Sequence, residues 1–200
     1  RSGSLEFGDL TFLPRSPKEA IKAKIAYCSE DRKHDGLFLG RPIMENISSP
    51  SLKSISNFGI RSNTIEEELS RDISAKFTVD ASRLTSEAGV LSGGNQQKVA
   101  LGKWLSINPK VILVNEPTRG VDVGARSEIY QKLRNLAAQG SAIVFASTDI
   151  QEITNLPDRV ISFYRGEMIK EIKLADMTAI KILSSITDPY SETSMQKKAN

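Results

Sequence analysis

The sequence predicts an α/β fold built around a parallel β-sheet. Residues 111–114 and 142–146 are short, continuous apolar runs, so each is expected to be a strand buried on both faces. Between them, residues 124–138 have the apolar spacing of an amphipathic helix, which Gly140 would end. A strand, a helix and a strand in this order predict a βαβ unit, whose two strands run parallel.

Residues 1–36 are expected to add short elements. Residues 3–13 alternate brief apolar pieces around a Gly-Asp pair, which is typical of a hairpin. A serine and a proline open the segment 16–23 and predict a short capped helix. Residues 25–28 predict a brief buried strand, and the polar run 29–36 after it is expected to form a loop.

The segment between residues 41 and 80 has a different composition. Five serines and a proline between positions 48 and 56 favour a connector. Beyond it, apolar residues recur at every fourth position, namely Ile65, Leu69, Ile73 and Phe77. This spacing predicts a helix of about four turns whose apolar stripe packs on its own domain.

The last third of the chain predicts a second hairpin. Residues 160–164 and 167–172 flank an Arg-Gly pair, a turn signal of moderate strength. The residues from 188 onward are polar and are expected to be disordered.

The composition excludes several classes of protein. The 27 basic and 24 acidic residues leave a net charge of +3, too small to indicate a nucleic-acid partner. A single cysteine, Cys28, rules out an internal disulfide and fits a reducing compartment. No apolar run approaches the roughly 20 residues of a membrane span, and no signal peptide or lipidation motif opens the chain. A membrane connection is therefore expected to run through a partner protein.

One candidate site lies at the start of a predicted helix. Gly93 and Gly94 would expose backbone N–H groups there, where the helix dipole adds positive potential, and Ser92 would add a hydroxyl donor. This arrangement predicts an anion site. The same three residues are also typical of a plain capping turn, so the motif alone does not decide between the two.

A second candidate site follows the strand 111–114. Asn115 and Glu116 would lie at the carboxyl edge of the parallel sheet, where ligands of such folds bind. Glu116 could orient or deprotonate a water, whereas Asn115 offers hydrogen bonds without a charge. Many strands simply end in polar turns, so this motif is also only suggestive by itself.

In combination, these segments resemble the ATP-binding subunits of ABC transporters. The first match is to the signature motif and is carried by Leu91, Ser92, Gly93, Gly94 and Asn95. The second is to the Walker B strand, with Asn115 at the metal position and Glu116 as the catalytic glutamate. The order and spacing of such elements fit from about residue 3 to residue 172.

Three further positions fit the same family. Asp122 lies in a segment similar to the D-loop, seven residues after the asparagine that ends Walker B. Glu30 stands at the Q-loop position, at the end of a predicted strand, and Thr148 stands at the position of the switch histidine.

Finer features are similar to one class of importer. Segments 30–33, 95–98 and 118–125 resemble the second, C-terminal nucleotide-binding domain of bacterial sugar importers of the ribose, galactose and xylose type. The resemblance implies ATP and Mg²⁺ as cofactors of the full-length assembly. It implies three partners: the first nucleotide-binding domain of the same polypeptide, membrane permease subunits and, indirectly, a periplasmic or extracellular sugar-binding protein. The implied location is peripheral, on the cytoplasmic face of the bacterial plasma membrane.

The resemblance also implies the domain organisation of an ABC-type P-loop ATPase core, truncated and without Walker A, with a helical subdomain. Residues 1–36 would be the truncated N-terminal part of the core. Residues 37–90 would be the helical subdomain and its approaches, which meet the membrane subunits. Residues 91–187 would hold the signature helix and the RecA-like α/β core, and residues 188–200 a disordered tail.

The chain departs from the family in its phosphate loop. A Walker A loop requires G-x-x-x-x-G-K-[ST], and glycines five apart occur only at Gly3/Gly8 and Gly89/Gly94, without the following lysine. The chain is therefore expected to begin downstream of that loop and to be inactive by itself. Its signature would act in trans on ATP held by the opposite domain, and its glycines are expected to matter there and not for folding.

Three substitutions separate the chain from a fully equipped domain. Asn115 replaces an aspartate, Glu30 a glutamine and Thr148 a histidine. The last two are expected in a second domain of this kind. The asparagine and the threonine also fit an alternative, a regulatory ABC domain that has lost catalysis.

Another alternative is the C-terminal ATPase lobe of a chromosome-maintenance or DNA-repair protein. Such lobes also carry a signature and Walker B without Walker A. They follow a long coiled coil, and no run of three or four heptads is present in this sequence.

The only histidine, His34, lies in a polar run and is expected to be a solvated surface residue.

Overall fold

The computed structural model describes residues 5–7, 10–12 and 14–187. It divides into two compact units, Arg1–Ala146 and Ser147–Asn200. Each unit has a hydrophobic core of its own and is described separately below. The division into segments 1–36, 37–90 and 91–187 remains a prediction from the sequence.

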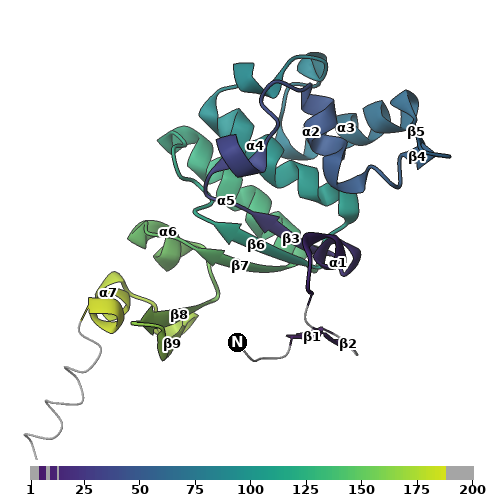
Figure 1. Cartoon of the computed structure of the whole chain (residues 1–200). Coiled ribbons are helices and arrows are strands. Elements are labelled where there is room, and N and C mark those ends of the chain that lie inside the picture. Colours follow the sequence, from purple (N-terminus) through teal and green to yellow (C-terminus); the bar gives the residue numbers. More distant parts are fainter. Residues whose placement is uncertain (1–4, 8–9, 13, 188–200) are drawn as a thin grey trace, which may run out of the picture. The chain divides into compact units, whose positions relative to one another are not determined.

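A parallel sheet forms one side of the first unit (Figure 1). Its strands β3 (Ile25–Cys28), β6 (Val111–Asn115) and β7 (Ala142–Ala146) lie in the order β3-β6-β7. Both pairings are parallel, which aligns the carboxyl ends of all three strands at one edge. Helix α5 (Val123–Ala138) connects β6 to β7, so the predicted βαβ unit is confirmed.

Helix α5 has one apolar face, as its sequence predicts. Ile129, Leu133 and Leu136 on that face are buried. The helix gives way at Gln139 to Gly140, whose φ of +97° lies in the left-handed region that favours glycine. The predicted C-terminal stop is therefore confirmed.

The sheet is not covered equally on its two faces. Tyr27, Leu113 and Val144 are aligned in register across β3, β6 and β7 and are 53%, 36% and 59% exposed. Burial on both faces was expected from the continuous apolar runs, and that expectation is wrong for this face. Successive side chains of a strand point to opposite faces, and on β6 the side chains of the other face, Ile112 and Val114, are buried.

Helices α2 (Ile43–Ser48), α3 (Asn63–Phe77) and α4 (Gly93–Gly102) pack together beside the sheet. A 3₁₀ segment, Lys103–Ile107, continues α4, so the helix predicted to start at Gly93 is confirmed. The core between these helices includes the buried Ile47.

The serine-rich segment is helical at its start, through Ser51, so the predicted connector is wrong there. Ser48 ends α2, and a 3₁₀ turn follows at Ser49–Ser51. The hydroxyls are bonded within this compact turn: Ser49 donates to the carbonyl of Asn46 and Ser51 to that of Ser48, three residues before each, while Ser48 donates to Glu66 of α3.

The stripe predicted for α3 is only partly correct. Ile73 and Phe77 are each 2% exposed, but Ile65 is 48% exposed. Positions four apart advance by about 40° around a helix at each step, so the stripe drifts away from the core toward the N-terminal end. Glu66 takes the buried place there, accepts a hydrogen bond from Ser48 and pairs with Arg61.

The N-terminal elements agree with the sequence except at one segment. Strands β1 (Leu5–Phe7) and β2 (Leu10–Phe12) pair antiparallel, while the Gly-Asp pair between them lies outside the described residues. Helix α1 (Pro17–Lys22) begins after Ser16, its N-cap. The loop predicted for residues 29–36 is wrong, since a π-helical turn, Arg32–Gly36, forms there. The carboxylate before it accepts hydrogen bonds from the N–H groups of Lys33 and His34.

The second unit contains α6 (Ile150–Asn155), β8 (Arg159–Tyr164), β9 (Glu167–Lys173) and α7 (Ala179–Thr187). The strands form the predicted hairpin, with φ of +50° and +87° at Arg165 and Gly166. The predicted tail, residues 188–200, lies outside the described residues.

The remaining elements are short. A two-stranded ribbon joins Ser56–Asn57 to Ile60–Arg61, and single 3₁₀ turns lie at Ala81–Arg83, Ala88–Val90 and Leu174–Asp176. In the described part of the chain, no helix combines the length and the apolarity that a bilayer crossing requires.

The partial burial of α3 can be tested with two isoleucines. We expect Ile73→Ala to lower the free energy of unfolding by about 2–5 kcal/mol, because it leaves a cavity in the core. Ile65→Ala on the same helix should cost less than about 1 kcal/mol, because that side chain is half exposed. Denaturant unfolding followed by circular dichroism measures both. Equal losses would contradict the burial described above.

Candidate functional site

The segment that resembles the signature motif begins helix α4. Ser92 is its N-cap and accepts a hydrogen bond at Oγ from the N–H of Asn95, at 3.4 Å. Leu91 is 7% exposed and anchors the chain just before the helix. Gly93 and Gly94 form the first helical positions, so N–H groups without intrahelical partners are expected in this turn. The arrangement is that of an anion-binding helix N-terminus.

Both glycines also have a packing reason, which the sequence did not reveal. A methyl group on Gly93 would lie 2.9 Å from Nη2 of Arg32 and 2.9 Å from the carbonyl oxygen of Gly120. On Gly94 it would lie 3.0 Å from Cβ of Ala125. These distances are too short for an unperturbed side chain, so the packing argues against the expectation that the glycines do not matter for folding.

The segment that resembles the D-loop packs on these glycines. Asp122 is the N-cap of α5 and accepts a hydrogen bond from the N–H of Ala125 at 2.9 Å. Gly120 before it has a φ of +64°. Val121 is 5% exposed, and its N–H donates to the carbonyl of Thr118 at 3.1 Å. The turn is therefore fixed both by its own hydrogen bonds and by the helix that it starts.

Asn115 and Glu116 lie together at the carboxyl end of β6. Asn115 pairs with Ala146 of β7 in the parallel register. Glu116 has a φ of +51°, and its N–H donates to the carbonyl of Ala146 at 2.8 Å. A left-handed conformation in a residue other than glycine costs about 1 kcal/mol or more. The backbone at Glu116 is therefore held in a defined, strained turn at the sheet edge.

Glu30 also lies at this edge of the sheet. It follows β3 and forms an ion pair with Arg119, Oε2 to Nη1, at 2.5 Å. Both side chains are largely exposed, so the pair contributes little to stability but joins the end of β3 to the turn after β6. Thr148 belongs to the second unit, just before Asp149, which caps α6.

Two buried cations near the site were missed by the sequence reading. Arg32 donates from Nη1 to the carbonyl of Arg119 at 2.7 Å and from Nη2 to that of Gly120 at 3.2 Å. Lys103 donates to the carbonyl of Gly36. Lys103 lies within an apolar stretch of sequence, which is a signal of burial. Arg32 lies in a polar run, and nothing in its sequence neighbourhood indicates burial.

Burial changes the acid–base properties of this group of side chains. It lowers the pKa of Arg32 and of Lys103 below their usual values, because the charged form loses hydration. It raises the pKa of the Cys28 thiol to about 11, although the two cations act in the opposite direction. Cys28 is therefore a neutral thiol at physiological pH and is not a candidate nucleophile.

The donor set fits a share in a nucleotide site better than a metal site of its own. Among the described residues, no three His, Cys, Asp or Glu side chains come together as metal ligands would. At the end of β6 the side chains are one neutral amide, Asn115, and one carboxylate, Glu116. Mg²⁺ is usually held by carboxylates together with substrate phosphates. These residues alone therefore do not make a strong magnesium site.

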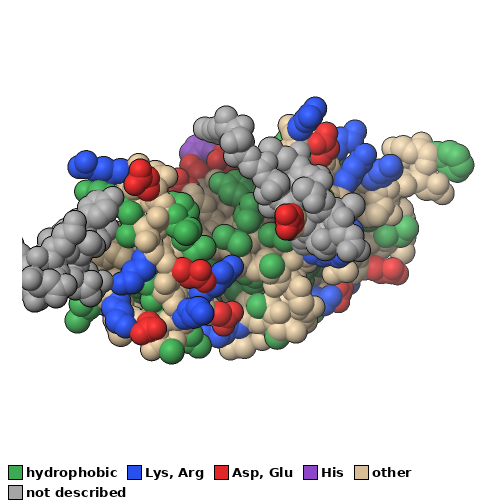
Figure 2. Space-filling model, turned by 90° about the horizontal axis from the view of Figure 1, so that it is seen from below, with side chains coloured by type: hydrophobic (Ala, Val, Ile, Leu, Met, Phe, Trp, Pro, Cys, Tyr) green, Lys and Arg blue, Asp and Glu red, His purple; other side chains and the backbone are tan. Residues whose placement is uncertain are grey.

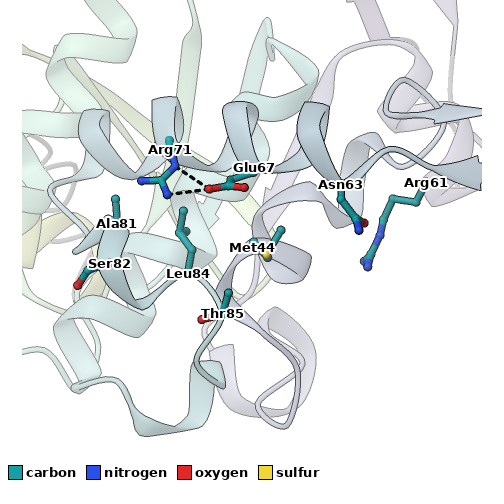
Figure 3. Close-up of a pocket in the computed structure, with 9 residues that line it drawn as sticks. All are labelled: Met44, Arg61, Asn63, Glu67, Arg71, Ala81, Ser82, Leu84 and Thr85. Atoms are coloured by element: carbon teal, nitrogen blue, oxygen red, sulfur yellow. Dashed lines mark hydrogen bonds and ion pairs between the residues drawn. The ribbon is translucent and has the colours of Figure 1, made fainter.

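A surface pocket of about 370 Å³ lies apart from these residues, on the helical part of the first unit (Figure 3). Figure 3 shows Arg71 directed toward Glu67, which accepts hydrogen bonds from it at 2.7 and 3.0 Å. The residues that line the pocket are Met44, Arg61, Asn63, Glu67, Arg71, Ala81, Ser82, Leu84 and Thr85. None of the predicted site residues is among them.

The charged side chains do not form a large field of one sign on the face seen in Figure 2. Basic and acidic side chains are interspersed there among apolar ones. Nucleic-acid-binding surfaces gather positive charge on one face. The view therefore gives no support to a nucleic-acid interface on this face.

Comparison with known proteins identifies related sequences. A family model described as ABC transporter matches residues 2–119. The chain is 37% identical over 182 residues to the ribose import ATP-binding protein RbsA 1 of Rhizobium meliloti (strain 1021), covering 91% of this chain and 36% of that protein. It is 41% identical over 194 residues to the arabinose import ATP-binding protein AraG of the same organism, covering 96% and 38%. The chain thus spans little more than a third of the length of these relatives.

Solved structures with the same fold are also known. A nucleotide-free ATP-binding cassette from an ABC transporter matches 94% of this chain and 77% of its own, with a TM-score of 0.77 and 20% identity. A dimeric ATP-binding cassette in a post-hydrolysis state, bound to ADP and Pi, matches 86% and 74%, with a TM-score of 0.71 and 22% identity. At these identities the likeness shows the fold alone. It confirms the predicted fold class, that of an ABC-type cassette core.

The packing of Gly93 predicts a stability effect. Gly93→Ala should lower the free energy of unfolding by about 1–3 kcal/mol, because the methyl group displaces the Arg32 guanidinium or the 119–120 turn. Gly40→Ala is the matched control, since nothing lies within 4 Å of an added methyl group there. Thermal and denaturant unfolding of the chain measure both. A Gly93→Ala variant as stable as the control would mean that the approach is loose.

Proposed function

The chain belongs to the ABC transporter family, and from this premise we propose that it is part of the ATP-binding subunit of a bacterial sugar importer. In the whole protein, ATP binding and hydrolysis would drive carbohydrate uptake. The ribose and arabinose importers among its relatives support carbohydrate as the class of cargo. The segments 30–33, 95–98 and 118–125 support an assignment to the second nucleotide-binding domain of that subunit.

The start of α4 is the observation that carries this proposal. Gly93 and Gly94 begin a ten-residue helix, and Ser92 beside them is exposed. The sequence contains no G-x-x-x-x-G-K-[ST] loop, so these residues do not themselves supply the amide nest and lysine that cradle a triphosphate. In our proposal they bind in trans, closing over the phosphates of an ATP held by the other nucleotide-binding domain. The dimeric cassette among the related folds supports such an arrangement.

Glu116 would act on the attacking water of the ATP held by this domain in the full-length protein. ATP supplies the phosphoryl group, and its transfer to water is favoured by a base that orients or deprotonates that water. The fixed backbone at Glu116, held by Ala146, supports a precise position for its carboxylate. Asn115 beside it would contact the Mg²⁺ shell without a charge.

The two sites of the transporter would then differ in activity. The site built on this domain's own Walker motifs has Asn115 and Thr148 in place of an aspartate and a histidine, which supports its role as an ATP-holding site. The opposite site, completed by Ser92, Gly93 and Gly94, would perform the hydrolysis. With this asymmetry both hypotheses can hold: the whole transporter hydrolyses ATP, while the domain described here has reduced catalytic activity of its own.

The proposed partners follow from the same assignment. They are the first nucleotide-binding domain of the same polypeptide, the membrane permease subunits and, indirectly, an extracytoplasmic sugar-binding protein. The permease would meet the helical region within residues 37–90. The protein would work at the cytoplasmic face of the plasma membrane, as a peripheral subunit.

Introducing a negative charge at position 92 distinguishes a phosphate-binding role of Ser92 from a role in helix capping alone. Aspartate and asparagine both cap helices well, so Ser92→Asp and Ser92→Asn should leave the thermal stability of the chain nearly unchanged. In the reconstituted full-length transporter, Ser92→Asp should lower steady-state ATPase by about tenfold or more, because its carboxylate repels the incoming phosphate, and Ser92→Asn by less than about threefold. The isolated chain should release no phosphate from Mg·ATP in any form. Equal ATPase in both variants would favour the plain capping turn.

The asparagine at position 115 predicts a further effect in the full-length transporter. Asn115→Asp restores a charge beside the divalent cation, which at low effective dielectric is worth several kcal/mol before screening. Mg²⁺-dependent nucleotide retention at the ATP-holding site should rise by about tenfold. The ATPase rate should rise by less than about twofold, because Thr148 still cannot make the contact to the γ-phosphate that a histidine would make. Filter binding with and without a chelator, together with phosphate release, measures the two. A several-fold rise in ATPase would show that the missing charge was limiting.

A further inference from the structure

A buried arginine lies beneath the start of α4. Arg32 is 9% exposed, and the two terminal nitrogens of its guanidinium donate to the carbonyl oxygens of Arg119 and Gly120. Among the described residues its hydrogen-bond partners are these two carbonyls, with no carboxylate. Its Nε has no partner. A buried cation whose hydrogen bonds run only to main-chain carbonyls is uncommon, because burial of a charge is costly unless the charge is paired. The carboxylate of Asp31 offsets part of that cost through space, without a hydrogen bond to the guanidinium.

Glycines leave the space that this guanidinium fills. A methyl group on Gly93 would lie 2.9 Å from Nη2, and on Gly120 it would lie 3.5 Å from Nη2 and 3.6 Å from Nη1. On Gly36 it would lie 3.2 Å from Cβ of Arg32. These glycines come from the π-helical turn, the first turn of α4 and the segment 119–122. The arginine therefore contacts all of the segments that resemble the Q-loop, signature and D-loop regions.

The chemistry of arginine suits this position and that of lysine does not. The guanidinium is a planar fork whose two terminal nitrogens reach two successive carbonyls at once. An ammonium on a flexible stem is a single point charge and would satisfy one of them. The positive charge also lies directly behind Gly93, where it adds to the potential of the helix N-terminus.

We propose that Arg32 is a positioning residue of the phosphate site formed by Ser92, Gly93 and Gly94. It holds the 119–120 turn against the first turn of α4, and so sets the place from which the N–H groups of α4 meet the phosphates. It does not touch the nucleotide itself. This inference rests on the function proposed above, in which those N–H groups act in trans.

The ion pair between Glu30 and Arg119 extends the same arrangement to the protein surface. Arg119 gives its carbonyl to Arg32 and its guanidinium to Glu30. The contacts therefore run from Glu30 to the 119–120 turn and, through Arg32, to Gly93. Arg32 is the buried link in this series of contacts, and the exposed ion pair is the outer one.

The test uses the full-length transporter with Arg32→Lys and Arg32→Met. The KM for ATP of both variants should stay within about threefold of the wild type, since the opposite domain holds the ATP. The kcat should fall by about tenfold for methionine and by about threefold to tenfold for lysine. Lys24→Met is the matched control. Lys24 also donates to a main-chain carbonyl, that of Ile107 at 2.7 Å, but it precedes the amino end of β3, at the edge of the sheet away from the site. Its loss should therefore lower the melting temperature without changing kcat per folded molecule.

The outcomes separate this inference from the proposed function. A kcat for both variants within about threefold of the wild type, per folded molecule, would overturn the role of Arg32. If Arg32→Met does not fold, the lysine variant decides, because it keeps the charge and loses the fork. If Ser92→Asp also leaves ATPase unchanged in the same preparation, the proposed trans site fails, and not only its positioning residue.

Discussion

The close approach between the first turn of α4 and the segment 119–122 is the constraint on which the rest of the site depends. Gly93 and Gly94 permit it because an added methyl group would reach Gly120 or Ala125 at about 3 Å. Arg32 fills the remaining space and binds the carbonyls that the turn directs inward. The same turn begins α5 through its Asp122 cap, so helix, turn and sheet edge share one geometry.

Glycines at both ends of helix α4 allow it to pack closely against two different parts of the first unit. At its C-terminal end, a methyl group on Gly102 would lie 3.2 Å from Ile73 and 3.2 Å from Phe77 of α3. In its middle, buried Lys98 forms an ion pair with Glu128 of α5. A close-packed helix transmits displacement instead of absorbing it.

The helical region is stabilised by polar groups inside it as well as by its apolar core. Glu66 is fully buried, yet it accepts a hydrogen bond from Ser48 and pairs with Arg61. The hydroxyls of Ser49 and Ser51 satisfy carbonyls one turn back. Buried polar groups that are paired in this way fix one arrangement of the helices, because a slipped packing would leave them without partners.

The sequence by itself determined the elements whose pattern is local: the βαβ unit, the capped helices, the hairpin of the second unit and the motifs that identify the family. It could not determine which contacts form between distant segments. Ile65 and Ile73 look alike in a four-residue repeat, and only packing showed that one is exposed. Arg32 looks like a surface residue, because its partners lie 87 and 88 positions away. Periodicity and capping act within a few residues, whereas burial and close approach are decided when the chain folds back on itself.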